Sequence, residues 1–367
     1  MEGKRRADYM REMGENAYFA ASNSVHGFRS YYGETFDRAE ITRVYAIKGG
    51  PGTGKSRFMR EVMEAGEGMG WQAESVYCSS DPDSLDGIIL WKDGQGIALL
   101  DATAPHVYEP KLPGAREEIV NLGDFWSADL LSKKAEEIAE KNRRKSEGYK
   151  RAYRYLSAYG EVNANRDILI RPCLRERAIT EFAAKLTRAI PEEDAFLPRT
   201  ALMRSVGMRG RVSFDTYFSS ASKIFLIEDC HGTGYRLMEE IYRCLANKHL
   251  RVRVSRDPLQ PDLVDGLFAE GAGYAFAVAS SEECRYPFRR ITTRRFLEPI
   301  RLRAIRAEVR YAERMCEALL SGAMEELDGV RQVHFELEEI YSAAMDFVRK
   351  EAFTKDFCNA LFGLQKP

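Results

Sequence analysis

The sequence predicts an α/β protein built from two tandem phosphate-loop units. Each unit is expected to hold a mostly parallel sheet flanked by helices, with an appended helical hairpin. A glycine-rich loop lies between an apolar, β-branched run and an amphipathic helical pattern. This strand–loop–helix pattern recurs 180 residues later, and a long, charged helical pattern follows each copy. A chain of 367 residues is also long enough for about two domains.

The first glycine loop fits the pattern G-x-x-x-x-G-K-[ST], with Gly49 and Gly54 as the fixed glycines before Lys55 and Ser56. Glycines let the backbone curl tightly, and the N–H groups of such a curl form a nest for phosphate oxygens. The helix that follows adds the positive end of its dipole. We therefore expect Lys55 to reach the β- and γ-phosphates of a nucleotide, and the Ser56 hydroxyl to bind Mg²⁺.

Composition is that of an ordinary soluble protein, with 44% hydrophobic and 30% charged residues. The formal net charge is −1, so neither nucleic acid nor a membrane surface is an expected partner. The seven cysteines are scattered without a C-x-x-C pair, which argues against a disulfide framework or a zinc site and favours a reducing compartment. Residues 1–10 are charged and do not resemble a secretory signal, and no apolar run approaches the ~18 residues needed to span a bilayer. We expect a cytoplasmic protein.

The second copy begins near residue 223, where Gly232-Thr233-Gly234 falls on Gly52-Thr53-Gly54. The similarity extends to both sides: residues 27–31 match 210–214, 81–82 match 257–258, 86–87 match 265–266, and 96–100 match 273–277. We infer two homologous units, residues 1–190 and 191–367, joined by an acidic, proline-marked stretch at 190–194.

The second loop has lost the residues that bind a triphosphate. Tyr235 stands at the lysine position and Arg236 at the serine position, while Glu228 and Asp229 bring two carboxylates that should repel phosphate. One interpretation is a degenerate scaffold that packs on the active half. The other is regulatory, with Arg236 or another arginine of this half approaching the γ-phosphate as an arginine finger.

Further candidates follow the first loop along the chain. Residues 72–78 are predicted to form a strand, and Asp81, just before a proline, is predicted to cap a helix. Because ligands bind at the carboxyl ends of strands in open α/β sheets, Asp81 or Asp83 is also a candidate to orient water or substrate.

An apolar run over residues 96–100 ends in Asp101, the position at which phosphate-loop enzymes hold Mg²⁺. Its counterpart in the second copy is Val278, so the lysine and this carboxylate are lost together. We expect Thr103 to sense the γ-phosphate, and His106 or Glu109 to position water or a second substrate. Ala102 stands where many ATPases carry a water-activating glutamate, so hydrolysis is expected to be slow, to use another carboxylate, or not to be the physiological reaction.

Residues 127–163 and 302–347 show charged helical patterns with apolar residues and tyrosines at helical spacing, from which we predict one helical hairpin in each unit. Residues 48–56, 78–87 and 101–106 together resemble a bacterial family of tandem phosphate-loop ATPases of the AAA-type Walker A kind. The resemblance spans essentially the whole chain and implies ATP binding. Members of that family carry two loops, and this chain differs by the loss of the second.

We therefore predict a slow ATPase that binds ATP and Mg²⁺ and whose nucleotide state moves its hairpins against an unidentified protein partner. The alternatives are a small-molecule kinase and a nucleotide-sensing module without catalysis. The residues expected to bind nucleotide are Gly49, Gly50, Pro51, Gly52, Thr53, Gly54, Lys55, Ser56, Arg57 and Thr103. The expected catalytic residues are Lys55, Asp101, Asp81 and His106, and the expected metal ligands are Ser56 and Asp101.

Overall fold

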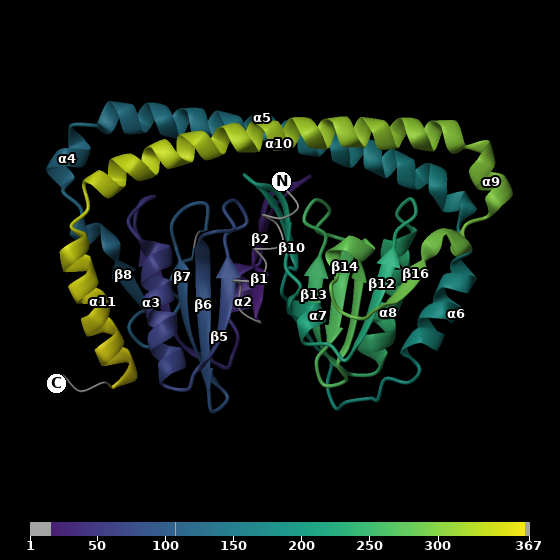
Figure 1. Cartoon of the computed structure of the whole chain (residues 1–367), viewed down its shortest axis with the longest axis horizontal. Helices are drawn as coiled ribbons and strands as arrows, with labels where there is room; N and C mark the ends of the chain where they lie inside the picture. Colours follow the sequence, from purple (N-terminus) through teal and green to yellow (C-terminus); the bar gives the residue numbers. More distant parts are fainter. Residues whose placement is uncertain (1–15, 107, 364–367) are drawn as a thin grey trace.

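The computed structural model describes residues 16–106 and 108–363. Two α/β units lie side by side and are bridged along one edge by two long helices (Figure 1). Residues 1–10, for which no secretory signal is expected, lie outside the described residues. Among the described residues, no helix combines the length and the apolar character needed to cross a lipid bilayer.

Each unit contains a mixed six-stranded sheet, and the two sheets share one strand order. In the first unit the order is β1 (Ala17–Phe19), β5 (Gln72–Tyr77), β6 (Leu85–Lys92), β7 (Gln95–Asp101), β4 (Ile41–Lys48) and β8 (Glu117–Asn121). In the second it is β9 (Leu197–Thr200), β13 (Arg251–Arg256), β14 (Val264–Ala269), β15 (Tyr274–Val278), β12 (Lys223–Glu228) and β16 (Arg289–Thr292). β6 and β14 run antiparallel to both neighbours, so each sheet is mixed. The other five strands of each sheet run in one direction, which agrees with the mostly parallel sheets that the sequence predicts.

The remaining elements also occur in matched pairs. They are the hairpins β2 (Ala21–Ser24)–β3 (Gly27–Ser30) and β10 (Arg204–Gly207)–β11 (Gly210–Ser213), and the short helices α2 (Tyr32–Phe36) and α7 (Thr216–Ser219). The loop helices are α3 (Lys55–Gly68) and α8 (Thr233–Asn247). Two short helices in each unit lead into the bridge: η1 (Leu122–Phe125) with α4 (Ala128–Ser132), and η4 (Thr293–Phe296) with α9 (Pro299–Ala304). Outside these pairs, η2 (Arg171–Cys173) follows the first long helix of the bridge, and η3 (Ser281–Glu283) follows β15. The internal repeat is therefore present in the order and pairing of the elements.

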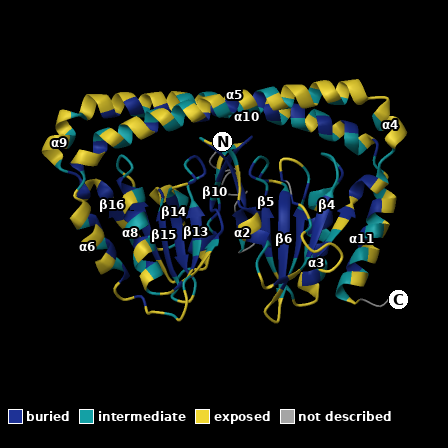
Figure 2. Cartoon of the chain, turned by 180° about the vertical axis from the view of Figure 1, so that it is seen from behind, coloured by how far each residue is buried: buried dark blue, intermediate teal, exposed yellow. Residues whose placement is uncertain are grey.

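Alternation along β4 divides its side chains between two cores. Tyr45 and Ile47 pack beneath α3, whereas Val44 and Ala46 face a core that also contains Tyr217 of the second unit. Because successive side chains of a strand point to opposite faces, an apolar run such as this one suits a sheet covered on both sides. The strands are accordingly buried, while the outer surface of the bridge is exposed (Figure 2).

The long helical patterns form one two-helix bridge and not two hairpins, so the hairpin prediction is wrong. α5 (Ala135–Ile170) runs from the first unit to the second, and α10 (Arg306–Ala343) returns beside it. The ion pairs Lys141–Glu336 and Arg151–Glu326 show the antiparallel register. Buried positions in α10 are mostly three or four residues apart, as in a coiled-coil seam: Val309, Ala312, Cys316, Ala323, Leu327, Val330, Val333, Leu337 and Ile340. Each helix therefore finds its partner in the other copy.

After crossing the bridge, the chain continues at each end into a helix that packs against the unit it has reached. α6 (Glu176–Thr187) follows α5 and packs against α8, whereas α11 (Phe347–Phe362) follows α10 and packs against α3. Isolated bridges, Trp126 with Met345 and Leu174 with Leu297, pair the connecting segments at the two ends. The stretch near residue 190 separates the two sheets, but α6 lies with the second unit.

A buried polar network joins the two units. Tyr18 donates to Glu74 at 2.7 Å, and Arg199 of the second unit donates to both, with an Nη1–Oε1 distance of 2.9 Å to Glu74. Burial alone would raise the pKa of the Glu74 carboxyl, but the Arg199 guanidinium outweighs burial and holds the pKa at about 2. Nearby, the equivalent residues Phe19 and Leu202 exchange backbone hydrogen bonds of 2.9 and 3.0 Å, which marks a local two-fold axis.

Gly207 tests whether the two units fold as one body. A Cβ at this position would lie 2.1 Å from the Ser79 carbonyl oxygen of the first unit, which leaves no room for a methyl group. We predict that Gly207→Ala lowers the free energy of unfolding by about 1–3 kcal/mol, measured by urea denaturation. Gly329→Ala on the bridge is the matched control, because nothing lies within 4 Å of its Cβ position. That change should be neutral or stabilise the helix by up to ~1 kcal/mol; equal effects of the two substitutions would contradict the shared core.

Candidate functional site

The first glycine loop connects the carboxyl end of β4 to α3. Gly52 and Gly54 have φ values of +69° and +80°, in the left-handed region that favours glycine. Gly54 directly precedes the first helical residue, so the loop lies at the positive end of the α3 dipole. Within the described part of the chain, the backbone N–H groups of Gly52 and Gly54 donate to no protein acceptor. They are donors of the kind that bind an anion at a helix N-terminus.

Three predicted residues meet at this loop. The Lys55 ammonium donates to the carbonyls of Gly49 and Gly50 at 3.0 and 2.8 Å, and lies 3.6 Å from the Asp101 carboxylate. Asp101 ends β7, the strand next to β4. Thr103 donates its hydroxyl to the Gly49 carbonyl at 2.9 Å and its N–H to Asp101 at 2.8 Å. A cation, a carboxylate and a hydroxyl are therefore held at the loop that carries the free amides.

Other predicted residues are engaged elsewhere. The Arg57 guanidinium points away from the loop to Glu61 and to Glu351 of α11. The Ser56 hydroxyl accepts the N–H of Leu85 at 3.0 Å. Thr53 is buried and donates its hydroxyl to the Gly50 carbonyl at 2.9 Å, which fixes the curl of the loop.

Asp81 does not cap a helix, because residues 79–84 form a turn into the antiparallel strand β6. The Ser84 N–H closes this turn on the Asp81 carbonyl at 2.9 Å. The helix-cap prediction is therefore wrong: the proline after Asp81 begins a turn. The Asp81 carboxylate lies 3.4 Å from the guanidinium of Arg209, which also pairs with Asp83. Arg209 lies between β10 and β11, so an arginine of the second half does reach the first unit.

The end of α10 covers the loop, which the sequence did not predict. Ser342 donates its hydroxyl to the Gly52 carbonyl at 2.9 Å across 290 residues of sequence. A Cβ on Gly52 would lie 2.4 Å from the Glu338 carbonyl oxygen, and one on Gly50 would lie 2.8 Å from the Tyr341 ring. No local pattern marks these helix residues, because they reach the loop only through the crossing of the bridge.

A second helix brings a cation near the same place. The Nζ of Lys145 on α5 lies 3.1 Å from Nδ1 of His334 on α10. Burial lowers the pKa of the Lys145 ammonium. Both helices of the bridge therefore contribute titratable side chains to the region above the first loop.

In the second loop, a carboxylate of the loop itself accepts the backbone N–H groups. Asp229, the first residue after β12, accepts the N–H groups of Gly232 and Gly234 at 2.8 and 2.6 Å. Gly49 holds the corresponding place after β4 and has no side chain to do this. The amides at the start of α8 are thus satisfied from within the chain, whereas those of the first loop are not.

The structure also corrects the alignment of the two loops by one residue. α3 buries Phe58, Met59 and Val62, and α8 buries Leu237, Met238 and Ile241, so equivalent helix residues are 179 positions apart. Gly234 therefore falls on Lys55, and Tyr235 falls on Ser56. The matching Gly-Thr-Gly triplets are not structurally equivalent.

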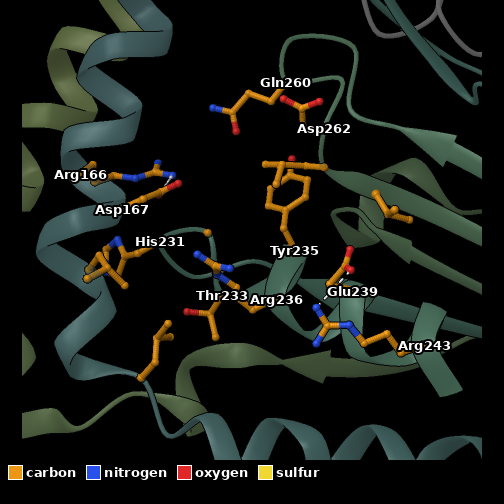
Figure 3. A pocket seen from close by; sticks show the side chains of 15 residues that line it. Arg166, Asp167, His231, Thr233, Tyr235, Arg236, Glu239, Arg243, Gln260 and Asp262 are labelled. Atoms are coloured by element: carbon orange, nitrogen blue, oxygen red, sulfur yellow. Dashed lines mark hydrogen bonds and ion pairs between the residues drawn. The ribbon is translucent and has the colours of Figure 1, made fainter.

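A cavity of about 340 Å³ lies beside the second loop (Figure 3). Its lining includes Arg166 and Asp167 of α5, which pair at 3.1 Å, together with His231 and Arg236. Arg236 therefore lines this cavity in the second unit, whereas the second-half arginine that pairs with Asp81 and Asp83 is Arg209.

Comparisons with protein-family models, with curated proteins and with solved structures find no match to this chain. The two loops of the chain itself differ in one respect that bears on function. One has free amides beside a lysine and a carboxylate, and the other has amides already bonded to Asp229.

This contrast predicts unequal roles for two neighbouring carboxylates in the second loop. Asp229→Ala should lower the free energy of unfolding by about 1–3 kcal/mol, because two amides lose their acceptor. Glu228→Ala is the matched control, since Glu228 makes a surface ion pair with Arg290 at 3.3 Å and should change stability by ~1 kcal/mol or less. Urea denaturation of both variants measures the difference, and equal losses would show that Asp229 does not hold the loop.

Proposed function

We propose that the first unit binds ATP with Mg²⁺ and hydrolyses it slowly, and that the second unit is a scaffold without a nucleotide site. The observation that carries the proposal is the pair of unbonded amides at Gly52 and Gly54 beside the Lys55 ammonium. A polyphosphate offers the oxygens that these amides need, and the helix dipole and the lysine stabilise its negative charge. This fits the resemblance to tandem phosphate-loop ATPases.

Asp101 supports the magnesium part of the proposal. It ends the strand beside the loop and lies 3.6 Å from Lys55. A carboxylate in this position supports a magnesium ligand for a bound Mg–ATP complex. Ala102 follows it and supplies no base to activate water. A slow turnover is the consequence we expect from this substitution.

The contacts of α10 favour a conformational change in this helix as the result of nucleotide binding. Tyr341, Ser342 and the backbone at Glu338 lie against the glycines of the loop, so nucleotide binding and the position of α10 are coupled. α10 extends from the first loop to the second unit, so a movement of its end would be transmitted along the whole bridge. A protein partner that recognises this bridge stays a prediction.

A kinase has less support from the geometry. Asp81 and Asp83, the carboxylates expected to orient an acceptor, are both paired with Arg209. The ion pairs leave neither carboxylate free to accept a substrate hydroxyl unless Arg209 moves. Phosphate release without an added acceptor distinguishes the ATPase from this alternative.

Lys55→Ala tests the proposal directly. Removing one charge-assisted contact of ~1.5–3 kcal/mol should raise the Kd of Mg–ATP about 10- to 150-fold in isothermal titration calorimetry. Lys92→Ala is the control, because Lys92 lies at the end of β6, at the opposite end of the strands from the glycine loop. Its ammonium donates there to the Met69 carbonyl at 3.0 Å. Its Kd should equal that of the wild type. Wild-type protein that takes up no Mg–ATP, or Lys55→Ala that binds it unchanged, contradicts the proposal.

A further inference from the structure

A cysteine, an aspartate and a histidine lie together beside the first loop. Cys78 follows β5, Asp86 lies on β6, and His106 lies in the loop after β7. One ligand atom from each lies within 4.8 Å of the others. The imidazole Nε2 is 3.2 Å from the Asp86 carboxylate, and both side chains are buried.

The surroundings of this trio leave polar groups without partners. Nδ1 of His106 and the hydroxyl of Tyr32 are buried and have no hydrogen-bond partner in the described part of the chain. The Tyr32 ring stacks on the imidazole at 4.7 Å, so the hydroxyl belongs to the same site. Unpaired buried polar groups cost free energy, so a ligand that engages these atoms would stabilise the site.

The repeat identifies the three corresponding residues in the second unit. Cys78 and Asp257 donate equivalent backbone hydrogen bonds, to Ser84 and Leu263, so Asp257 matches Cys78 and not Asp81 as the sequence comparison suggested. Asp265 occupies the position of Asp86 in the strand pairing. His106 and Glu283 each close the turn after the equivalent strand, with N–H bonds of 2.9 and 3.2 Å. The counterpart trio is therefore Asp257, Asp265 and Glu283.

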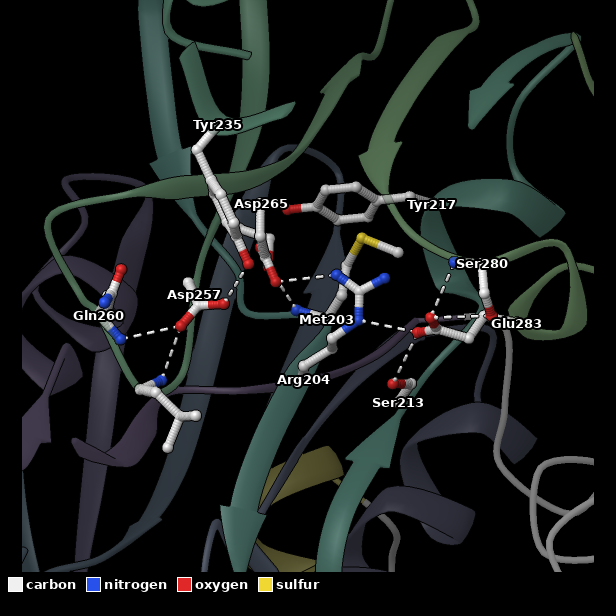
Figure 4. A network of polar contacts seen from close by, with 12 residues as sticks. Met203, Arg204, Ser213, Tyr217, Tyr235, Asp257, Gln260, Asp265, Ser280 and Glu283 are labelled. Carbon is white, nitrogen blue, oxygen red and sulfur yellow. Dashed lines mark hydrogen bonds and ion pairs between the residues drawn. The ribbon is translucent and has the colours of Figure 1, made fainter. Parts of the chain in front are cut away.

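In the second unit a cation binds two members of this trio, and a tyrosine hydroxyl binds the third (Figure 4). Arg204 lies 2.8 Å from Asp265 and 3.1 Å from Glu283, and Tyr235 donates to Asp257 at 2.7 Å. The first unit has no equivalent guanidinium: the register of the two hairpins places Ala21 where Arg204 stands. Asp86 therefore lacks the guanidinium that pairs with Asp265, and its ion-pair partner among the described residues is the His106 imidazole at 3.2 Å. A cation bound between them would take the place of that guanidinium.

We propose that Cys78, Asp86 and His106 bind a divalent transition-metal ion of the Zn²⁺ class, separate from the Mg²⁺ that accompanies the nucleotide. A thiolate and an imidazole select zinc-like ions over Mg²⁺, which prefers oxygen ligands. Three protein ligands with an open fourth position match the ligand number of catalytic zinc sites. The ion takes the structural place of the Arg204 guanidinium in the other unit.

The ion would connect three segments that surround the nucleotide loop. It joins the end of β5, the strand β6 and the loop that carries Thr103, whose side chain contacts the Gly49 carbonyl. The scattered cysteines argue against a zinc site at the level of sequence, because the proposed ligands are separate in the chain and only one of them is a cysteine. The proposal does not depend on ATP binding and can be tested in its absence.

Cobalt substitution of the full-length protein tests the proposal. After treatment with a chelator and dialysis, the wild type should bind one Co²⁺ per chain and show thiolate-to-cobalt charge-transfer absorption in the near ultraviolet. Zn²⁺ should displace the ion and remove the absorption. Cys78→Ser should lose the band and bind Zn²⁺ at least ~10–100-fold more weakly, since even loss of an outer-shell partner has effects of this size.

Cys244→Ser is the matched control, a partly buried cysteine on α8 of the second unit, and it should keep the band. Lys55→Ala should also keep it, which separates this proposal from nucleotide binding. Circular dichroism establishes that each variant is folded, and Asp86→Asn serves as a second ligand variant. Wild-type protein that binds no Co²⁺ or Zn²⁺ at micromolar concentration, or a band that survives in Cys78→Ser, overturns the proposal and leaves a buried Asp86–His106 ion pair.

Discussion

The backbone N–H groups of a curled glycine loop need an acceptor, and the two halves of this protein meet that need differently. In the second unit the acceptor is covalently part of the loop, because the Asp229 carboxylate bonds to Gly232 and Gly234. In the first unit the equivalent strand end carries Gly49, and a lysine lies beside the amides. The same fold thus gives one self-satisfied loop and one loop suited to an external anion. The pair acts as an internal comparison, since strand order and helix packing are shared.

The crossing of the bridge connects each loop to the opposite unit. α10 starts in the second unit and ends against the glycines of the first loop, and α5 brings Asp167 to within 3.2 Å of the Cβ position of Gly232 in the second loop. Neither unit can therefore change its loop without affecting a helix that is anchored in the other. The shared core and the Glu74–Arg199 pair hold the sheets together, so we expect the proposed nucleotide-driven movement in the bridge and not at the sheet interface.

Sequence predicts the local features of this protein well and the long-range ones poorly. The strand–loop–helix setting, the strand that ends at Asp101 and the repeat follow from spacing and alternation, which act over a few residues. The prediction of two helical hairpins is wrong because helical periodicity shows where a helix forms but not which other helix packs against it. The one-residue shift between Lys55 and its counterpart was missed because the Gly-Thr-Gly triplets align by identity, whereas the buried faces of α3 and α8 set the true register. Arg209, Ser342 and the Cys78–Asp86–His106 trio depend on tertiary contacts that no local pattern encodes.

Amide hydrogen exchange with and without saturating Mg–ATP tests whether the first loop binds an anion, because it measures the backbone N–H groups themselves. We predict slower exchange over residues 49–56 on nucleotide binding, altered exchange at the end of α10, and no change over residues 229–234. Protection of the second loop, or unchanged exchange in the first loop when ATP is saturating, would contradict this prediction.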